Sequence, residues 1–430
     1  MTTPAVPALT ESAYVLTLAL LLIAPLAVAG LALINTGLGR SRSAAQSLLG
    51  SLALVSVAVL VFALIGATIA DGSSGSGHIF RLFAKSWNWA GTGPLFLGGF
   101  ASQSSHTQLV SLFEFLSVAL AVLIPWGSGA DRWRLAAGIA SAAILSALIF
   151  PFVAHWTWGN GWLAQLGLNF SLGAGFLDPG GAAAIHLLGG LSALAVVWIA
   201  GSRRGKFPKE GLSTAMPGHN AVYVLFGCLV ALVGWLAINM AGSLLFLSAA
   251  PAALPVVAVN TLLAAAAALA ATFTVTQVRF GKPDASLCAN GWLAGLVTSS
   301  ACAAVATPLQ SLFIGAVAGI AIPLLVEVLE LAVSVDDPSG AISVHAAGAL
   351  LGLIAAGLFA PLRGQLTAQL VGIATLLGLF LPLLYLLFFV LNRFVPFRVD
   401  PDGERIGMDL HELGGGAYPE FVVHRDDSYR

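Results

Sequence analysis

Two histidines occupy the same place in a pattern that occurs twice in the sequence. Residues 178–186 read Asp-Pro-Gly-Gly-Ala-Ala-Ala-Ile-His, and residues 337–345 read Asp-Pro-Ser-Gly-Ala-Ile-Ser-Val-His. Two neutral imidazoles can hydrogen-bond to each other, one donating and one accepting. Such a pair would pass a small hydrogen-bonding molecule or relay a proton, whereas a bare alkali cation needs rings of oxygen ligands.

Each copy of the pattern starts a long apolar segment, which we expect to be a helix in a membrane. An Asp before a Pro is typical of a helix N-cap followed by the first helical residue. His186 and His345 then lie about 12 Å along their helices, where ionisable side chains are costly and mark conduction paths. Two alternatives are histidines that only pack the helices together and a metal site, although two imidazoles fall short of a closed metal site.

The composition indicates a membrane protein. The 430 residues are 58% hydrophobic and 9% charged, whereas soluble chains carry about 25% charged residues. Apolar runs of about 20 residues span a bilayer as helices, and the alternation of a β-barrel is missing, so we predict an all-α polytopic membrane fold. We count eleven transmembrane runs, roughly at 14–36, 46–70, 106–126, 133–155, 181–201, 219–241, 252–276, 286–306, 308–333, 341–362 and 367–392.

Positive charge is distributed unevenly between the loops that join these runs. Ten Lys and Arg residues lie in the loops after odd-numbered spans, and three lie in the loops after even-numbered spans. Because Lys and Arg concentrate on the cytoplasmic side, we expect a multi-pass protein of the cell (inner) membrane with its N-terminus outside and its C-terminus inside. The net charge of −1 excludes the basic field that nucleic-acid binding needs.

The two copies of the pattern start the fifth and the tenth span, so they enter the membrane from opposite sides. This is the arrangement of an inverted repeat, whose functional site lies near the midplane at the repeat interface. We therefore predict an inverted five-plus-five repeat within a transmembrane channel domain, residues 1–392, followed by a cytoplasmic tail, residues 393–430. Repeat one covers 14–201, repeat two covers 219–362, and an extra helix covers 367–392.

Further residues give the chain a resemblance to a known family. Trp158 ends the run Ala-His-Trp-Thr-Trp, and the two Asp–His patterns lie in a frame of eleven spans. With these residues the sequence resembles the ammonium transporter/Rhesus (Amt/Mep/Rh) family over essentially its whole length. The resemblance implies that Trp158 helps to cradle ammonium through cation–π contact, that Asp178 is the conserved aspartate, and that His186 and His345 are the pore histidines.

The sequence departs from the family pattern above the histidines. Relatives have two stacked phenylalanines above the histidines, and the resemblance places Phe113 and Ser117 where phenylalanines are common, with Glu114 between them. At the second gate position, in the sixth span, this sequence has Ile238. The family's Asn-Ala-Gly-Ser run is one residue longer here and ends at Ser243. Glu114 either gathers cations at the mouth or faces a neighbouring subunit, and both interpretations stay open.

The expected site has two parts that differ in their role. The residues expected to line the pore are His186, His345 and Ile238. The residues expected to recruit the substrate are Trp158, Phe113, Glu114, Ser243 and Asp178. We expect neither a cofactor nor a metal, and no nucleophile–base–acid set indicates an enzyme.

The resemblance implies a homotrimer with one pore per subunit. Each pore would take up ammonium and conduct ammonia, with or without a separately transferred proton, and a PII-type regulator would bind on the cytoplasmic side. Two other functions are open. One is an ammonium sensor with little flux, and the other is a pore for another small neutral molecule such as carbon dioxide.

Overall fold

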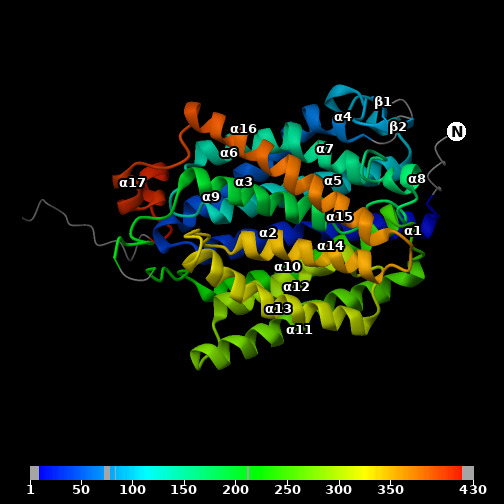
Figure 1. The fold of residues 1–430 in the computed structure, drawn as a ribbon. Coiled ribbons are helices and arrows are strands. Elements are labelled where there is room, and N and C mark those ends of the chain that lie inside the picture. Colours follow the sequence, from blue (N-terminus) through cyan, green and yellow to red (C-terminus); the bar gives the residue numbers. More distant parts are fainter. Residues whose placement is uncertain (1–8, 72–77, 83, 211–212, 419–430) are drawn as a thin grey trace, which may run out of the picture.

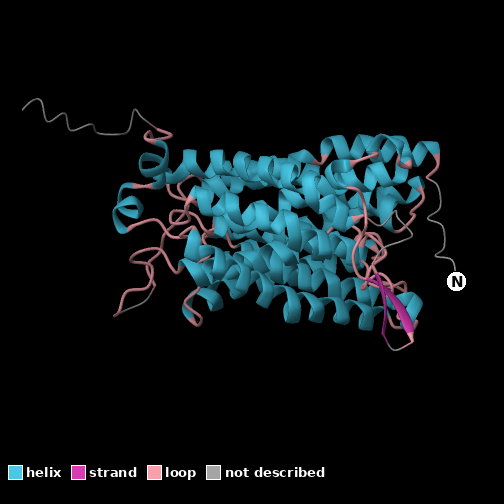
Figure 2. Ribbon diagram, turned by 90° about the horizontal axis from the view of Figure 1, so that it is seen from above, coloured by secondary structure: helices cyan, strands magenta, loops and turns pink. Residues whose placement is uncertain are grey.

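Long apolar helices run side by side through the length of the molecule (Figures 1 and 2). The computed structural model describes residues 9–71, 78–82, 84–210 and 213–418. The elements of its first half are α1 (Glu11–Ile23), α2 (Pro25–Leu38), α3 (Ala44–Val61), α4 (Ala67–Ala70), β1 (Ile79–Leu82), β2 (Lys85–Asn88), α5 (Ser105–Ser128), α6 (Leu135–Ile144), α7 (Phe150–Thr157), α8 (Leu166–Phe170) and α9 (Leu188–Ala200).

The second half is helical throughout its described regular elements. It contains α10 (Ala221–Phe246), α11 (Leu254–Phe280), α12 (Ala285–Cys302), α13 (Pro308–Leu331), α14 (Gly348–Phe359), α15 (Gln365–Thr375), α16 (Leu381–Phe394) and α17 (Pro401–Ile406). Several long helices change locally to π-helical geometry, at Phe62–Gly66, Leu145–Ile149, Ala182–Leu187, Ile342–Ala347 and Leu376–Phe380. The strands β1 and β2 pair antiparallel as one hairpin.

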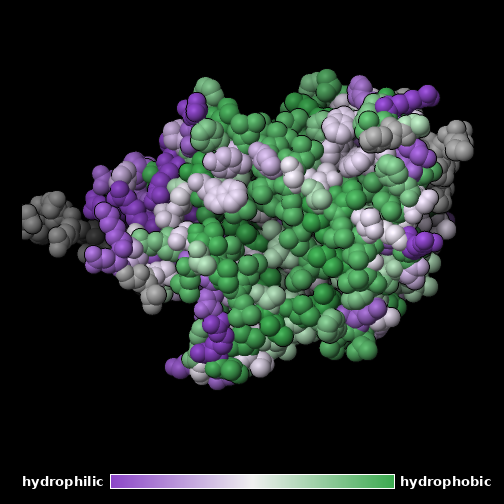
Figure 3. Space-filling model, in the orientation of Figure 1, coloured by the Kyte–Doolittle hydropathy of each residue, from purple (hydrophilic) through white to green (hydrophobic). Residues whose placement is uncertain are grey.

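Ten helices of the described residues are long and apolar enough to cross a membrane. They correspond to ten of the eleven predicted spans and confirm a mostly helical, polytopic membrane fold. Figure 3 shows an apolar surface along the middle of the molecule and polar residues at its two ends. Such a belt would be covered by the hydrocarbon of a bilayer, where closed helices satisfy the backbone.

The remaining predicted span, 286–306, corresponds to α12, which forms a helix of 18 residues but is less apolar than the others. Its polar side chains are buried, because α12 packs against α10, α11, α13 and α14. The Thr298 hydroxyl donates to the Gly348 carbonyl oxygen, and Ser299 accepts a hydrogen bond from Asn239. The count of eleven crossings therefore stays a prediction.

The repeated sequence pattern adopts a repeated local structure. The Asp178 carboxylate accepts hydrogen bonds from the N–H groups of Ala183 (3.0 Å) and Ala184 (2.9 Å), and Asp337 accepts one from Ile342 (2.7 Å). These acceptors satisfy helix N-termini that would otherwise leave N–H groups unpaired in an apolar surrounding.

A glycine with left-handed backbone follows each of these aspartates. Gly181 has φ 81° and Gly340 has φ 68°, a conformation that residues with a Cβ adopt only at a cost. Each glycine leads into a π-helical segment that contains the histidine, Ala182–Leu187 in the first copy and Ile342–Ala347 in the second. Irregular helical turns of this kind occur frequently at functional sites.

The two histidine-bearing helices pack against each other. The second π-helical segment contacts α9, and the first contacts α14. A Cβ atom at Gly190 would lie 2.5 Å from the Ala346 nitrogen, so this crossing requires a residue without a side chain. The close approach fixes the depth at which the histidines meet.

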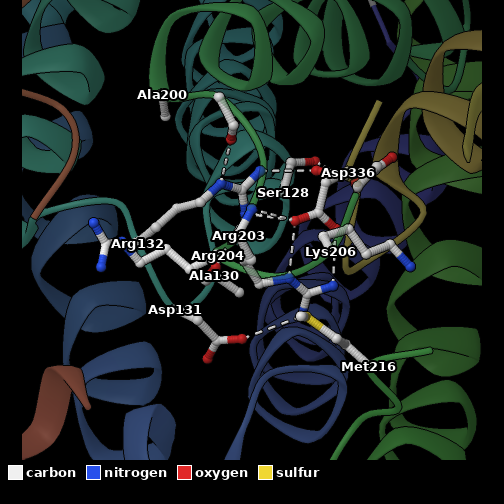
Figure 4. A network of polar contacts seen from close by, with 12 residues as sticks. Ser128, Ala130, Asp131, Arg132, Ala200, Arg203, Arg204, Lys206, Met216 and Asp336 are labelled. Atoms are coloured by element: carbon white, nitrogen blue, oxygen red, sulfur yellow. Dashed lines mark hydrogen bonds and ion pairs between the residues drawn. The ribbon is translucent and has the colours of Figure 1, made fainter. Parts of the chain in front are cut away.

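A buried ionic cluster lies between helix ends far apart in the sequence (Figure 4). The Arg203 guanidinium donates to both carboxylate oxygens of Asp336, at 2.9 and 3.0 Å, and to Asp131 at 3.2 Å. Arg132 donates to the Asp336 carbonyl oxygen at 2.8 Å and to that of Gly201 at 2.6 Å. Because Asp336 directly precedes Asp337, this cluster holds the start of the helix that carries His345.

The C-terminal segment docks on the same end of the bundle, opposite to the end where α1 begins (Figure 1). The Glu404 carboxylate accepts from the Arg204 N–H at 2.6 Å and pairs with Arg398 at 2.7 Å. Asp409 accepts from the N–H groups of Ala45 and Gln46 at the start of α3. The tail is therefore tied to the loop after α9 and to the first turn of α3 through backbone N–H groups.

Replacing Asp336 by Asn should destabilise the fold. Removing one partner of a buried ion pair leaves an uncompensated charge and costs about 3 to 5 kcal/mol, so we expect D336N to lower the free energy of unfolding in detergent by that order. Asp402, paired with Arg405 and exposed, is the matched control, and D402N should change the free energy by less than about 0.5 kcal/mol. Equal stability of the two variants would contradict the structural role of the cluster.

The same pair predicts an acid sensitivity. Burial alone would raise the pKa of Asp336, but hydrogen bonds from Arg203 and the charge of Arg132 lower it from 3.8 to about 2. The pKa of Asp336 in the folded protein lies below its ordinary value. The ion pair therefore contributes its full stabilisation of the fold above about pH 4, and this contribution is lost as the pH falls toward 2. The stability difference between the parent and D336N should therefore shrink across this interval, as followed by unfolding at pH 6, 4 and 3.

Candidate functional site

His186 and His345 meet in the interior of the bundle. Their Nδ1 atoms lie 3.3 Å apart, and their ring centroids are 5.3 Å apart with an interplanar angle of 26°. Both residues are at most 2% exposed. For two neutral rings this contact requires one Nδ1–H donor and one Nδ1 acceptor, so the pair offers a polar line without a fixed charge.

Trp235 on α10 supports the first of these histidines, and sequence reasoning did not single it out. Its indole lies parallel to the His186 ring, with centroids 5.1 Å apart and an angle of 7°. It is 1% exposed. The available signal in the sequence was a tryptophan among small and aliphatic residues, three positions before Ile238. Its stacking on His186 could not be inferred from that signal, because the stacking depends on how α10 is rotated about its axis.

Ile238 itself is buried on α10, one helical turn beyond Trp235. Ser117 is buried on α5, where its hydroxyl donates to the Phe113 carbonyl oxygen at 2.7 Å. Phe115 packs edge-on against Phe62, with centroids 5.1 Å apart. The predicted gate positions therefore carry a single phenylalanine, Phe113.

A cavity of about 1,090 Å³ opens at the end of the bundle where α1 begins, and we call it the vestibule. Three carboxylates belong to its wall, from Glu11, Asp71 and Glu114, and the described lining residues include neither Lys nor Arg. Glu114 lies in the vestibule wall, and the role of its carboxylate in gathering cations stays a prediction. The surplus of negative charge favours cations at this mouth.

Three aromatic rings form a cluster at the vestibule. Trp158 and Phe246 are stacked, with centroids 5.1 Å apart at an angle of 9°. Phe113 meets both edge-on, at 5.2 Å from Trp158 and 5.1 Å from Phe246. Trp158 and Phe246 line the cavity, whereas Phe113 is buried behind them.

Phe246 was missed because the sixth span was predicted to end at residue 241. Helix α10 continues to Phe246, which brings this ring about two turns beyond Ile238. The apolar residues that follow Ser243 were the available signal. An aromatic residue near the outer end of a span is also typical of a membrane interface, so position alone could not assign it to the vestibule.

Asp178 and Ser243 are engaged inside the structure. The Asp178 carboxylate binds two N–H groups, and its carbonyl oxygen accepts from the Trp158 indole N–H at 2.7 Å. Burial raises the pKa of the Asp178 carboxyl to about 6, and the N–H groups that it binds oppose that rise. Ser243 donates to the Asn239 carbonyl oxygen at 2.7 Å. The structure thus places Asp178 behind Trp158. Contact of Asp178 or Ser243 with a substrate stays a prediction.

The part of the chain that the structure describes contains no group of three or more His, Cys, Asp or Glu side chains placed to hold a metal ion. The three cysteines are buried and unpaired. The groups of the site that can bind a cation or pass a hydrogen-bonding molecule are its imidazoles, aromatic rings and carboxylates.

Comparison with known proteins identifies the family of this chain. The sequence model of the Ammonium Transporter Family matches residues 14–418. The chain belongs to the ammonium transporter family. It is 34% identical to the "Ammonium transporter Amt2" of Archaeoglobus fulgidus over 421 residues, covering 92% of this chain and 85% of the relative. It is 28% identical to the "Ammonium transporter" of Bacillus subtilis, covering 91% of this chain and 95% of the relative.

Solved structures of the ammonium transporter family have the same fold. A chain named "Sensor Amt Protein" superposes with a TM-score of 0.83 at 26% identity, covering 93% of this chain and 98% of that chain. Mep2 of Candida albicans superposes with a TM-score of 0.78 at 22% identity, covering 96% and 91%. The similarity extends over nearly the whole molecule, so both histidine-bearing helices lie within the shared fold.

Replacing Trp235 by Leu should impair ammonium uptake, because the stacked indole orients the His186 ring. Aromatic stacking of this kind contributes about 0.5 to 1.5 kcal/mol, so we expect uptake in reconstituted vesicles to fall roughly twofold to tenfold. Trp198, on α9 and 51% exposed, provides the control, since W198L leaves the histidines untouched. Unchanged uptake by a correctly folded W235L protein would show that the stacking does not position His186.

Proposed function

We propose that this protein takes up ammonium at the vestibule and conducts it across the membrane as ammonia past His186 and His345. The observation that carries the proposal is the contact between two buried imidazoles in matching π-helical segments. Packing alone would not require the same Asp–Gly–His arrangement in both halves of the chain. The names of the relatives as ammonium transporters support the substrate.

Recruitment of the cation is assigned to the vestibule. Carboxylates in a cleft with apolar walls raise the local concentration of cations, and Glu114 and Asp71 supply them here. Trp158 adds a cation–π contact, with Phe113 packed behind it. Asp178 contributes by holding the Trp158 indole through its carbonyl oxygen, and Ser243 is the proposed hydroxyl of the same region.

Conduction then requires loss of charge. Moving an intact cation through an apolar pore costs far more than moving a neutral molecule, so ammonium gives up a proton before it passes Ile238. Ammonia can accept from an imidazole N–H and donate to an imidazole nitrogen as it passes the pair. The proton either stays outside or moves separately along the two histidines.

The finer topology belongs to the same proposal. We place eleven transmembrane helices in an inverted five-plus-five repeat with the N-terminus outside and the C-terminal tail in the cytoplasm. The positions of α1 and α17 at opposite ends of the bundle support an odd number of crossings (Figure 1). The channel domain would extend to residue 392, and assembly as a homotrimer in the cell (inner) membrane, with a PII-type regulator at the tail, rests on the family resemblance.

A sensor of ammonium with little flux is the second candidate. The solved chain named "Sensor Amt Protein" covers nearly all of this protein, so the fold accommodates that role. The carboxylates of the vestibule favour a cationic ligand in either case. They argue against a pore for a neutral solute such as carbon dioxide, which would not benefit from them.

Ammonium applied to liposomes that contain the protein should evoke a current or an internal alkalinisation. A current that His186→Ala or His345→Ala abolishes, or changes in ion selectivity, would establish charge-coupled transport through the pair. Alkalinisation above that of empty liposomes, without current, would establish an ammonia pore. Trp198→Leu, remote from the pair, should leave either signal unchanged.

Silence in both measurements would contradict transport. In that case, the binding of ammonium to the protein in the same vesicles would be measured by calorimetry. This measurement would distinguish a sensor from a protein with no ammonium site. Binding that is lost in Trp158→Ala would favour the sensor.

A further inference from the structure

The vestibule is far larger than ammonium requires. Its volume of about 1,090 Å³ slightly exceeds the range of pockets for drug-sized ligands, about 300 to 1,000 Å³. It is also formed by distant parts of the chain, including the start of α1, the start of α5 and the end of α10. A site of this size can hold an organic molecule.

Acidic side chains lie at more than one depth in the vestibule. Glu11, Asp71 and Glu114 are all part of its wall, and the Glu114 and Asp71 carboxylates are close enough to interact electrostatically. Two neighbouring carboxylates in a partly desolvated cleft repel each other, and a positive charge placed near them relieves this repulsion. Glu11 lies in the first turn of α1 and is exposed, whereas Glu114 is 3% exposed. Negative charge is therefore present both at the rim and in the depth of the cavity.

The Glu114 carboxyl group lies in the vestibule wall without a hydrogen-bond donor from the described residues. None of the residues that the structure describes donates a hydrogen bond to its carboxylate or forms an ion pair with it, although the side chain is 97% buried. Buried carboxylates are normally paired or hydrogen-bonded. Because Glu114 is part of the cavity wall, a ligand in the vestibule can supply the missing donor.

Aromatic and apolar surface lies beside this carboxylate. Trp158, Phe176 and Phe246 line the same cavity. Rings of this kind bind ammonium groups through cation–π contact and also cover alkyl chains. The wall thus combines separated negative charges with apolar surface, a combination that a linear diamine complements along its length.

We propose that the vestibule binds linear organic dications that carry a primary ammonium group at each end. One ammonium group binds Glu114 against the aromatic rings, and the other binds toward Asp71 and the rim. Such a ligand occupies the mouth and competes with ammonium for it. The inference rests on the proposed function for the location of the recruitment site, but binding can be measured whether or not the chain conducts.

The test compares two probes with the same four-carbon chain by calorimetry on the purified full chain. The probes are 1,4-diaminobutane, with two ammonium groups, and n-butylamine, with one. Since each charge-assisted hydrogen bond to a carboxylate is strong, we expect the parent to bind the diamine at least about tenfold more tightly. Glu114→Gln should bring the two affinities to within about twofold, whereas Glu114→Asp, which keeps the charge, should retain a preference for the diamine.

Glu327→Gln is the matched control, because Glu327 pairs with Arg279 outside the vestibule, and it should keep the parent's preference. Equal affinities of the parent for both probes, binding of neither probe, or an unchanged preference in a folded Glu114→Gln protein would overturn the inference. A parent that conducts ammonium but shows no preference for the diamine refutes the dication site alone. A parent that prefers the diamine but neither conducts nor binds ammonium refutes the proposed function and leaves the dication site.

Discussion

A polar group inside a bilayer must find a partner within the protein, and the pair of His186 and His345 is the structure's response to that constraint. Each ring satisfies one nitrogen of the other at 3.3 Å, so that neither needs a charge or a water molecule on that side. The consequences extend through both helices. The aspartates satisfy the N–H groups at the helix starts, the left-handed glycines turn the chain, and Gly190 lets the helices approach closely enough for the rings to meet.

The two Asp-Pro turns connect the histidines to opposite ends of the molecule. At the vestibule end, the Asp178 carbonyl oxygen binds the Trp158 indole, so the first histidine helix and the aromatic cluster share one turn. At the other end, Asp336 joins Arg203 and Arg132, while its neighbour Asp337 receives the Ser128 hydroxyl. The tail reaches this second turn through Glu404 and the backbone of Arg204. Each Asp-Pro turn is thus fixed by its own set of contacts, and the two helices that follow these turns share the histidine contact.

The sequence carried enough information to predict the histidine pair and most helices, because a repeated pattern and hydropathy are local properties. Stacking of Trp235 on His186 could not be predicted, since it depends on how two helices are rotated. The burial of Arg132 and Arg203 was also hidden. As loop cations they indicate topology, yet their guanidinium groups also form the ionic cluster. The orientation of the Glu114 side chain could not be predicted either, for the same reason as that of Trp235. In a uniformly apolar span, no amphipathic pattern indicates which face of the helix a residue lies on.

The packing of Trp158 bears on how a cation is attracted in the proposed mechanism. Phe246 covers one face of the indole, and Phe113 meets both rings edge-on. A ring presents its negative potential at its faces, whereas its edge is positive, so stacking leaves Trp158 less surface for cation–π contact than a free indole has. The attraction must then come largely from the carboxylates, whose field acts over several ångströms in a cleft with apolar walls. We therefore propose that Glu114, which lies beside Phe113 in sequence and in the vestibule wall in space, compensates for the aromatic surface that the cluster itself conceals.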